Sequence, residues 1–87
     1  MQAEKILKRM KQNKRDWSMK DITLVAKHLE IPFTNNGSSH YVFKYTGIIE
    51  HVNIPNHKDI HPDYITQFLK FIEKVKNLKI TTTTQQT

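Results

Sequence analysis

The fold is decided by residues 36–55, which read NGSSHYVFKYTGIIEHVNIP. Asn36-Gly37 is a strong turn signal, because both residues tolerate positive φ. Residues 39–46 follow the turn and alternate between two faces, as the side chains of a half-buried strand do. One face carries Tyr41, Phe43 and Tyr45, and the other carries His40, Val42, Lys44 and Thr46. The aromatic face is predicted to be the core face, which leaves His40 on the open side of a sheet.

Two further strands flank this one. Residues 31–35 precede the turn and are predicted to form a short first strand. After a second turn at Gly47, residues 50–55 form a third strand, with Val52 and Ile54 on one face and His51 and Asn53 on the other. The three strands are consecutive and joined by short turns, so the sequence predicts an antiparallel sheet.

Helices are expected on both sides of these strands in the sequence. Residues 3–13 carry a narrow apolar stripe at helical spacing. Ser18 is a good N-cap for a second helix that extends to Leu29, with Asp21 three residues on in a variant of the capping box. Pro62 suits the first position of a final helix, whose apolar stripe runs to residue 78. The last seven residues, 81–87, are only Thr and Gln and are predicted to be a disordered tail.

The order helix, helix, three strands, helix predicts an α+β fold. Three antiparallel strands have one face to cover, and the helices carry the apolar stripes that cover it. We expect a two-layer domain over residues 1–80, with a three-stranded antiparallel sheet, helices on one face and an additional N-terminal helix. Residues 1–15 form a basic N-terminal extension to it.

Composition narrows the class of protein. The chain has 87 residues, which is the size of one small domain. It has no cysteine, so disulfides, thiolate metal sites and a cysteine nucleophile are excluded. No apolar run approaches the length of a membrane span, and the charged N-terminus lacks a signal-peptide core. The sequence therefore predicts a cytoplasmic protein without a membrane partner.

The charge is +6 and unevenly distributed. Residues 1–15 hold six basic residues against Glu4 alone, whereas residues 16–87 hold eight against seven acids. This excess favours an anionic partner such as nucleic acid or an acidic protein. The N-terminal excess is equally compatible with a frayed, solubilising terminus.

The segment Gly37-Ser38-Ser39-His40 can carry chemistry. It brings two hydroxyls and an imidazole close together after a permissive glycine. An imidazole titrates near neutral pH, which suits general base catalysis. The alternative is a polar hairpin turn with an exposed histidine. His57 and His61 are four residues apart, but Pro62 starts the helix after them, so they share no helical face and no metal site is predicted.

The chain resembles the HicA family, also called YcfA-like, of small bacterial mRNA interferase toxins. The resemblance rests on Gly37-Ser38-Ser39-His40-Tyr41-Val42-Phe43, a Gly-Ser-x-His motif followed by alternating apolar residues. A capped helix precedes the motif, and the strand ending in Ile54-Pro55-Asn56-His57 follows it. A last helix from Pro62 completes a match over residues 3–76.

The resemblance implies a fold similar to double-stranded RNA-binding domains and ribosome-independent cleavage of mRNA by His40 in a stress response. It implies a HicB-type antitoxin that blocks the site, and no cofactor. In the mechanism we expect, His40 takes the proton from a ribose 2′-OH, which attacks the adjacent phosphate. Backbone N–H groups and hydroxyls of Gly37, Ser38 and Ser39 support the reacting phosphate, together with Lys44. His57 is the first candidate for the general acid, and His51 is the second.

Two other functions fit the same residues. A non-catalytic RNA-binding module would use the fold and the basic extension to contact phosphates, with His40 as one contact. An interaction protein would bind only an acidic antitoxin surface, with no catalysis. Cleavage of RNA would distinguish the ribonuclease hypothesis from both of these.

Overall fold

A computed structural model describes residues 2–35 and 39–86 of the chain. Its elements follow the predicted order, and their bounds are α1 Gln2–Gln12, α2 Met19–His28, β1 Phe33–Thr34, β2 His40–Tyr45, β3 Ile48–Pro55 and α3 Pro62–Gln86. The strands form one antiparallel sheet in the order β1-β2-β3, so β2 is the central strand. The predicted α+β class, with helices on one face of a three-stranded sheet and an additional N-terminal helix, is confirmed.

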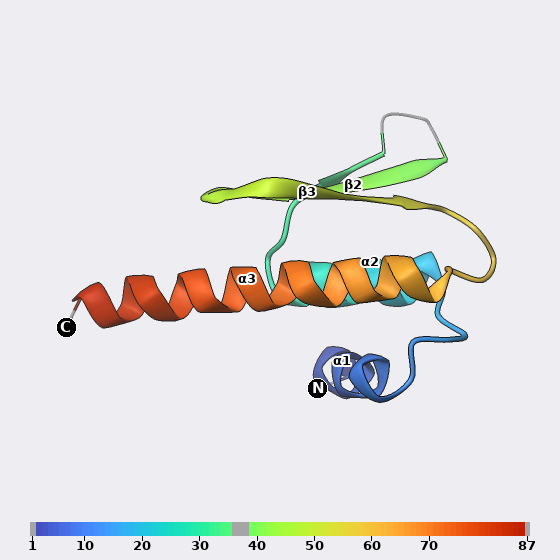
Figure 1. Cartoon of the computed structure of the whole chain (residues 1–87), viewed down its shortest axis with the longest axis horizontal. Coiled ribbons are helices and arrows are strands. Elements are labelled where there is room, and N and C mark those ends of the chain that lie inside the picture. Colours follow the sequence, from blue (N-terminus) through green and yellow to red (C-terminus); the bar gives the residue numbers. More distant parts are fainter. Residues whose placement is uncertain (1, 36–38, 87) are drawn as a thin grey trace.

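The helices lie on one side of the sheet in two successive layers. Figure 1 shows α3 and α2 beneath the sheet and α1 on the far side of these two helices. The helix α1 therefore does not reach the sheet, and the basic N-terminal extension is separated from it by α2 and α3. Among the described residues, no helix is both long and apolar enough to cross a membrane.

The aromatic face of β2 is the core face, as predicted. Phe43 is fully buried, and its ring lies 5.4 Å from that of Phe68 on α3. Tyr41 and Tyr45 are half-buried and pack against the same core. On β3, Val52 and Ile54 are buried. The alternation along β2 and β3 thus sets which face of the sheet stays open.

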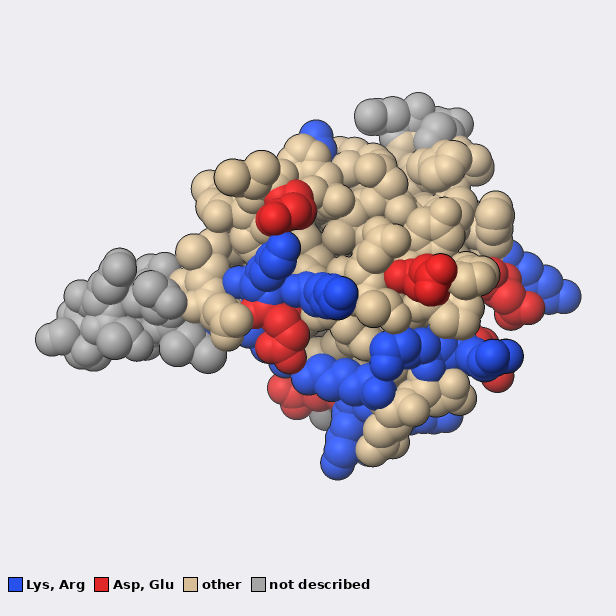
Figure 2. Space-filling view, in the orientation of Figure 1, with Lys and Arg blue, Asp and Glu red and all other residues tan. Residues whose placement is uncertain are grey.

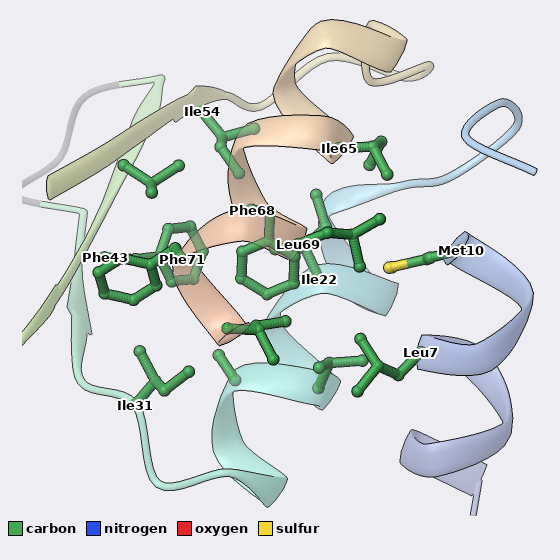
Figure 3. Close-up of a cluster of buried hydrophobic side chains, with 14 of the residues drawn as sticks. Leu7, Met10, Ile22, Ile31, Phe43, Ile54, Ile65, Phe68, Leu69 and Phe71 are labelled. Atoms are coloured by element: carbon green, nitrogen blue, oxygen red, sulfur yellow. The ribbon is translucent and has the colours of Figure 1, made fainter. Parts of the chain in front are cut away.

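The buried cluster continues through the helix layer to α1. Figure 3 shows Phe43 on the sheet side of α3, and Leu7 and Met10 of α1 on its other side, facing Leu69. Met10 has no exposed surface, and Leu7 is 6% exposed. Burial of side chains such as these contributes about 1.5–3 kcal/mol each. The N-terminal stripe is therefore part of the core.

The α1–α2 connection is held by Trp17. This residue is buried, and its indole Nε1–H donates to the Asn13 carbonyl oxygen at 2.7 Å. The Arg9 guanidinium carbon lies 5.8 Å from the centre of the Trp17 ring. The N–H of Ile60 donates to the Trp17 carbonyl oxygen at 3.0 Å. Trp17 thereby ties α1 to the segment that precedes α3.

Two helix boundaries show how local sequence acts. At the start of α2, the Ser18 N–H and hydroxyl each donate to Asp21 Oδ2 at 3.1 Å, so the predicted capping pair is present. The end of α3 differs from the prediction, because residues 81–86 are helical instead of a disordered tail. An established helix gains one backbone hydrogen bond for each residue it adds, so it can extend without an apolar stripe.

Strand lengths also differ from the prediction in two places. The first strand, predicted at residues 31–35, is reduced to Phe33–Thr34, because Pro32 has no N–H to donate to a neighbouring strand. The third strand begins at Ile48 instead of residue 50. The tight turn at Gly47 returns the chain at once, so Ile48 pairs with Tyr45.

Gly47 is a position where substitution should have a clear cost. Its φ is +95°, and a Cβ added there would lie 2.8 Å from Leu78 Cδ2 on α3. We expect Gly47→Ala to destabilise the domain by about 1–3 kcal/mol, because an L-residue is strained at this φ and the Leu78 side chain must move. Urea unfolding measures this, with Thr46→Ala as the neighbouring exposed control. Equal unfolding midpoints for the two variants would contradict the expected cost of a side chain at Gly47.

Candidate functional site

His40 is the first residue of the central strand and is exposed. Its strand neighbours Tyr41 and Phe43 establish the orientation, since Phe43 is buried among the helices and successive side chains alternate. The His40 side chain therefore belongs to the face of the sheet that the helices do not cover. A ligand on the open face can reach it without any movement of the core.

Backbone pairing fixes the surroundings of His40. It is paired with Pro55 across the sheet. The Asn56 N–H donates to the Ser39 carbonyl oxygen at 2.6 Å, and the His57 N–H donates to the Pro55 carbonyl oxygen at 2.9 Å. These bonds place His57 two residues beyond the cross-strand partner of His40. Two of the predicted site residues, Ser39 and His57, thus lie at the same end of the sheet as His40, and both are exposed.

Lys44 lies on the same face as His40 but is not adjacent to it. The two residues are four positions apart on β2, which corresponds to about 13 Å along a strand. His51 is likewise four positions before Pro55 on β3, so it also lies toward the other end of the sheet. Lys44 and His51 therefore lie toward the end of the sheet away from His40, whereas His57 lies at the same end as His40.

The open face between these two ends presents neutral side chains. Val42 lies at its centre, directly paired with Thr34 on one side and Asn53 on the other. Beyond them, Ile49 is 92% exposed. The only acidic residue in the three strands is Glu50, whose carboxylate lies 3.2 Å from Lys74 Nζ on α3. No carboxylate of the strands is thus directed onto the open face, which suits a polyanionic ligand.

Gly37 and Ser38 lie outside the described residues, so their predicted support of the reacting phosphate stays a prediction. The neighbouring Ser39 is described, and its carbonyl oxygen is engaged with Asn56.

His61 has a role that sequence reasoning missed. Its Nδ1 accepts the N–H of Asp63 at 3.1 Å, so the imidazole caps the N-terminus of α3. The signal was available in the sequence, because His61 directly precedes Pro62 at the first helical position. It was overlooked because the usual N-cap residues are Ser, Thr, Asp and Asn, and histidine is not among them.

The described part of the chain contains no group of three or more His, Asp or Glu residues placed to hold a metal ion. Comparison of the chain with protein-family models, with curated proteins and with solved structures finds no match.

Proposed function

We propose that this protein is a HicA-like toxin, a cytoplasmic endoribonuclease that cleaves mRNA with His40 and is neutralised by a HicB-type antitoxin. The observation that carries the proposal is the place of His40: exposed, on the open face, at the end of the central strand where Ser39 and Asn56 are bonded. The resemblance over residues 3–76 supports the same assignment.

The proposed reaction is transfer of the phosphate to the neighbouring ribose oxygen. His40 accepts the proton of the 2′-OH, the 2′ oxygen attacks phosphorus, and the bond to the 5′ oxygen breaks. The leaving oxygen takes a proton from a general acid, for which His57 is the first candidate and His51 the second. The products are a 2′,3′-cyclic phosphate and a 5′-OH end. DNA has no 2′-OH and cannot react in this way.

The flanking contacts follow from the strand geometry. Because Lys44 lies about 13 Å from His40 along β2, it would contact a phosphate beside the reacting one. An antitoxin that covers the open face would exclude RNA from His40 and Lys44 together. A face without a strand carboxylate is suited to an acidic covering surface as well as to RNA.

The test is cleavage of a single-stranded RNA by the purified protein in EDTA, followed by analysis of the new ends. We expect RNA to be cut, with cyclic phosphate and 5′-OH products. A matched RNA with one 2′-deoxy nucleotide at the mapped site, and DNA of the same sequence, should remain intact. Cleavage of the DNA, or 5′-phosphate products, would contradict the mechanism. RNA binding without any cleavage would leave the RNA-binding module as the function.

A further inference from the structure

Three surface hollows border α3, one at its N-terminus and two further along it, on the side of β3 and on the side of α1. The first lies at its N-terminus beside His57 and has a volume of about 450 Å³. The second, of about 260 Å³, lies between α3 and the outer edge of β3. The third, of about 250 Å³, lies between α3 and α1. The first and second share Gln67 as a lining residue, and the second and third share Lys70. We call this set of hollows the α3 track.

The regular spacing of α3 explains why neighbouring hollows share lining residues. Tyr64, Gln67, Lys70 and Lys74 recur every three or four residues, so they lie on one face of the helix. The buried stripe of α3 occupies the other positions, including Phe68 and Ile72. The eleven residues from Tyr64 to Lys74 span about 15 Å at 1.5 Å per residue. The α3 track is therefore long enough for several nucleotides.

The α3 track has an excess of positive charge toward α1. Figure 2 shows Lys and Arg side chains gathered over the exposed side of α3 and over α1 below it. The residues are Lys11 and Lys14 near the end of the N-terminal segment, and Lys70 and Lys74 on α3. They outnumber the carboxylates of these two hollows, Glu50 and Glu73.

Both carboxylates are already engaged with one lysine each. Glu73 Oε1 lies 3.5 Å from Lys11 Nζ, and Glu50 Oε1 lies 3.2 Å from Lys74 Nζ. A hydrogen bond from its own backbone holds the pKa of Glu50 below its usual range, and Lys74 contributes in the same direction. Within residues 2–35 and 39–86, no ion pair is formed by Lys14 or Lys70. These two lysines are left to meet an external anion.

We infer that the α3 track binds the phosphate backbone of a single RNA strand that extends from the His40 end of the sheet toward α1. This inference rests on the proposed function. RNA fits better than an acidic protein because the α3 track begins at His57, at the same end of the sheet as His40, so one strand can extend from the site into the track. Half-buried Tyr64 in the first hollow offers a ring on which a base can stack.

The experiment measures RNA affinity of full-length His40→Ala protein, which is expected not to cut, against salt concentration. Two RNAs are compared, of about 4 and about 16 nucleotides, the range of common single-strand site sizes. The test variant is Lys14→Ala with Lys70→Ala. The charge-matched control is Lys20→Ala with Lys27→Ala, two exposed lysines of α2 that line none of the three hollows.

For the long RNA, we expect the slope of log affinity against log salt to be smaller by about 1.4 in the test variant, since each single-strand phosphate contact contributes about 0.7. The short RNA and the control variant should behave as the parent does. Lys14→Arg with Lys70→Arg should restore the slope, because the charge is retained. Circular dichroism checks that each variant is folded.

Three other results would each contradict either the α3 track or the proposed function. An unchanged slope for the long RNA overturns the α3 track as an RNA site, and binding of poly-glutamate lost only in the test variant would then identify an acidic protein as its partner. An equal loss on the short and the long RNA also overturns it, because the lysines would then act at the cleavage site. If the parent protein binds neither RNA, the proposed function fails instead.

Discussion

His40→Ala is expected to lower the rate of RNA cleavage by about 10²–10⁴-fold, the usual contribution of a general base. The imidazole is exposed on the open face of the sheet and belongs to no part of the core, so its removal should leave the fold intact. RNA affinity should change little, because phosphate contacts supply most of it. The measurement is the single-turnover cleavage rate with saturating protein, beside RNA binding and thermal unfolding.

A second histidine serves as a control, to separate a catalytic effect of His40→Ala from the effect of removing any histidine. His28 lies on α2, in the helix layer, with its Nε2 3.9 Å from Glu4 Oε1. His28→Ala should cut RNA at the parent rate. His40→Asn preserves a polar group of similar reach without a titrating nitrogen, so it should be as inactive as alanine. A His40→Asn protein that cuts at the parent rate would remove His40 from the chemistry while leaving the protein a nuclease.

Removal of residues 1–15 is expected to abolish cooperative unfolding of the domain. The segment contributes Ala3, Leu7 and Met10 to the core, and all three are buried. Truncating one buried Met or Leu to Ala costs about 2–5 kcal/mol, whereas a domain of this size has about 4–13 kcal/mol of stability in total. Loss of the whole segment would also expose the faces of α2 and α3 that α1 covers.

Urea unfolding followed by circular dichroism measures this effect. Met10→Ala should unfold at a clearly lower urea concentration than the parent protein. Lys5→Ala and Lys8→Ala remove charges from exposed positions of α1 and should shift stability by no more than about 0.5 kcal/mol. A deletion variant with the parent midpoint would show that α1 is dispensable. If the deletion unfolds as expected, the RNA contacts of residues 1–15 can be tested only by point substitution.

Much of the fold could be read from local patterns, because their causes are local. Alternation on β2 identified the aromatic core face, and Ser18 with Asp21 identified the start of α2. Gly47 identified the second turn. The predicted ends of two elements differ from the structure, since the start of β3 and the end of α3 depend on backbone hydrogen bonds that continue past any sequence signal.

Part of the candidate site could likewise be predicted from local patterns, and part could not. His40 could be placed on the open face from alternation alone. The position of His57 at the same end of the sheet as His40 could not be predicted in this way. It depends on the β2–β3 register and on the hydrogen bond from the Asn56 N–H to the Ser39 carbonyl oxygen. Lys44 was predicted to support the phosphate at His40 because the two share a face, but they are four residues apart on β2. Under the proposed function, Lys44 would therefore contact a flanking phosphate.

The sequence by itself determined the order of elements, the face of each strand and the basic character of residues 1–15, since these depend only on residue type and period. Only the tertiary structure decided where that charge lies. Burial of Leu7 and Met10 docks α1 beneath α2 and α3, on the side away from the sheet. Apolar burial in three dimensions therefore separated the basic segment from His40, and brought Lys14 beside Lys70 of a helix more than fifty residues later in the chain.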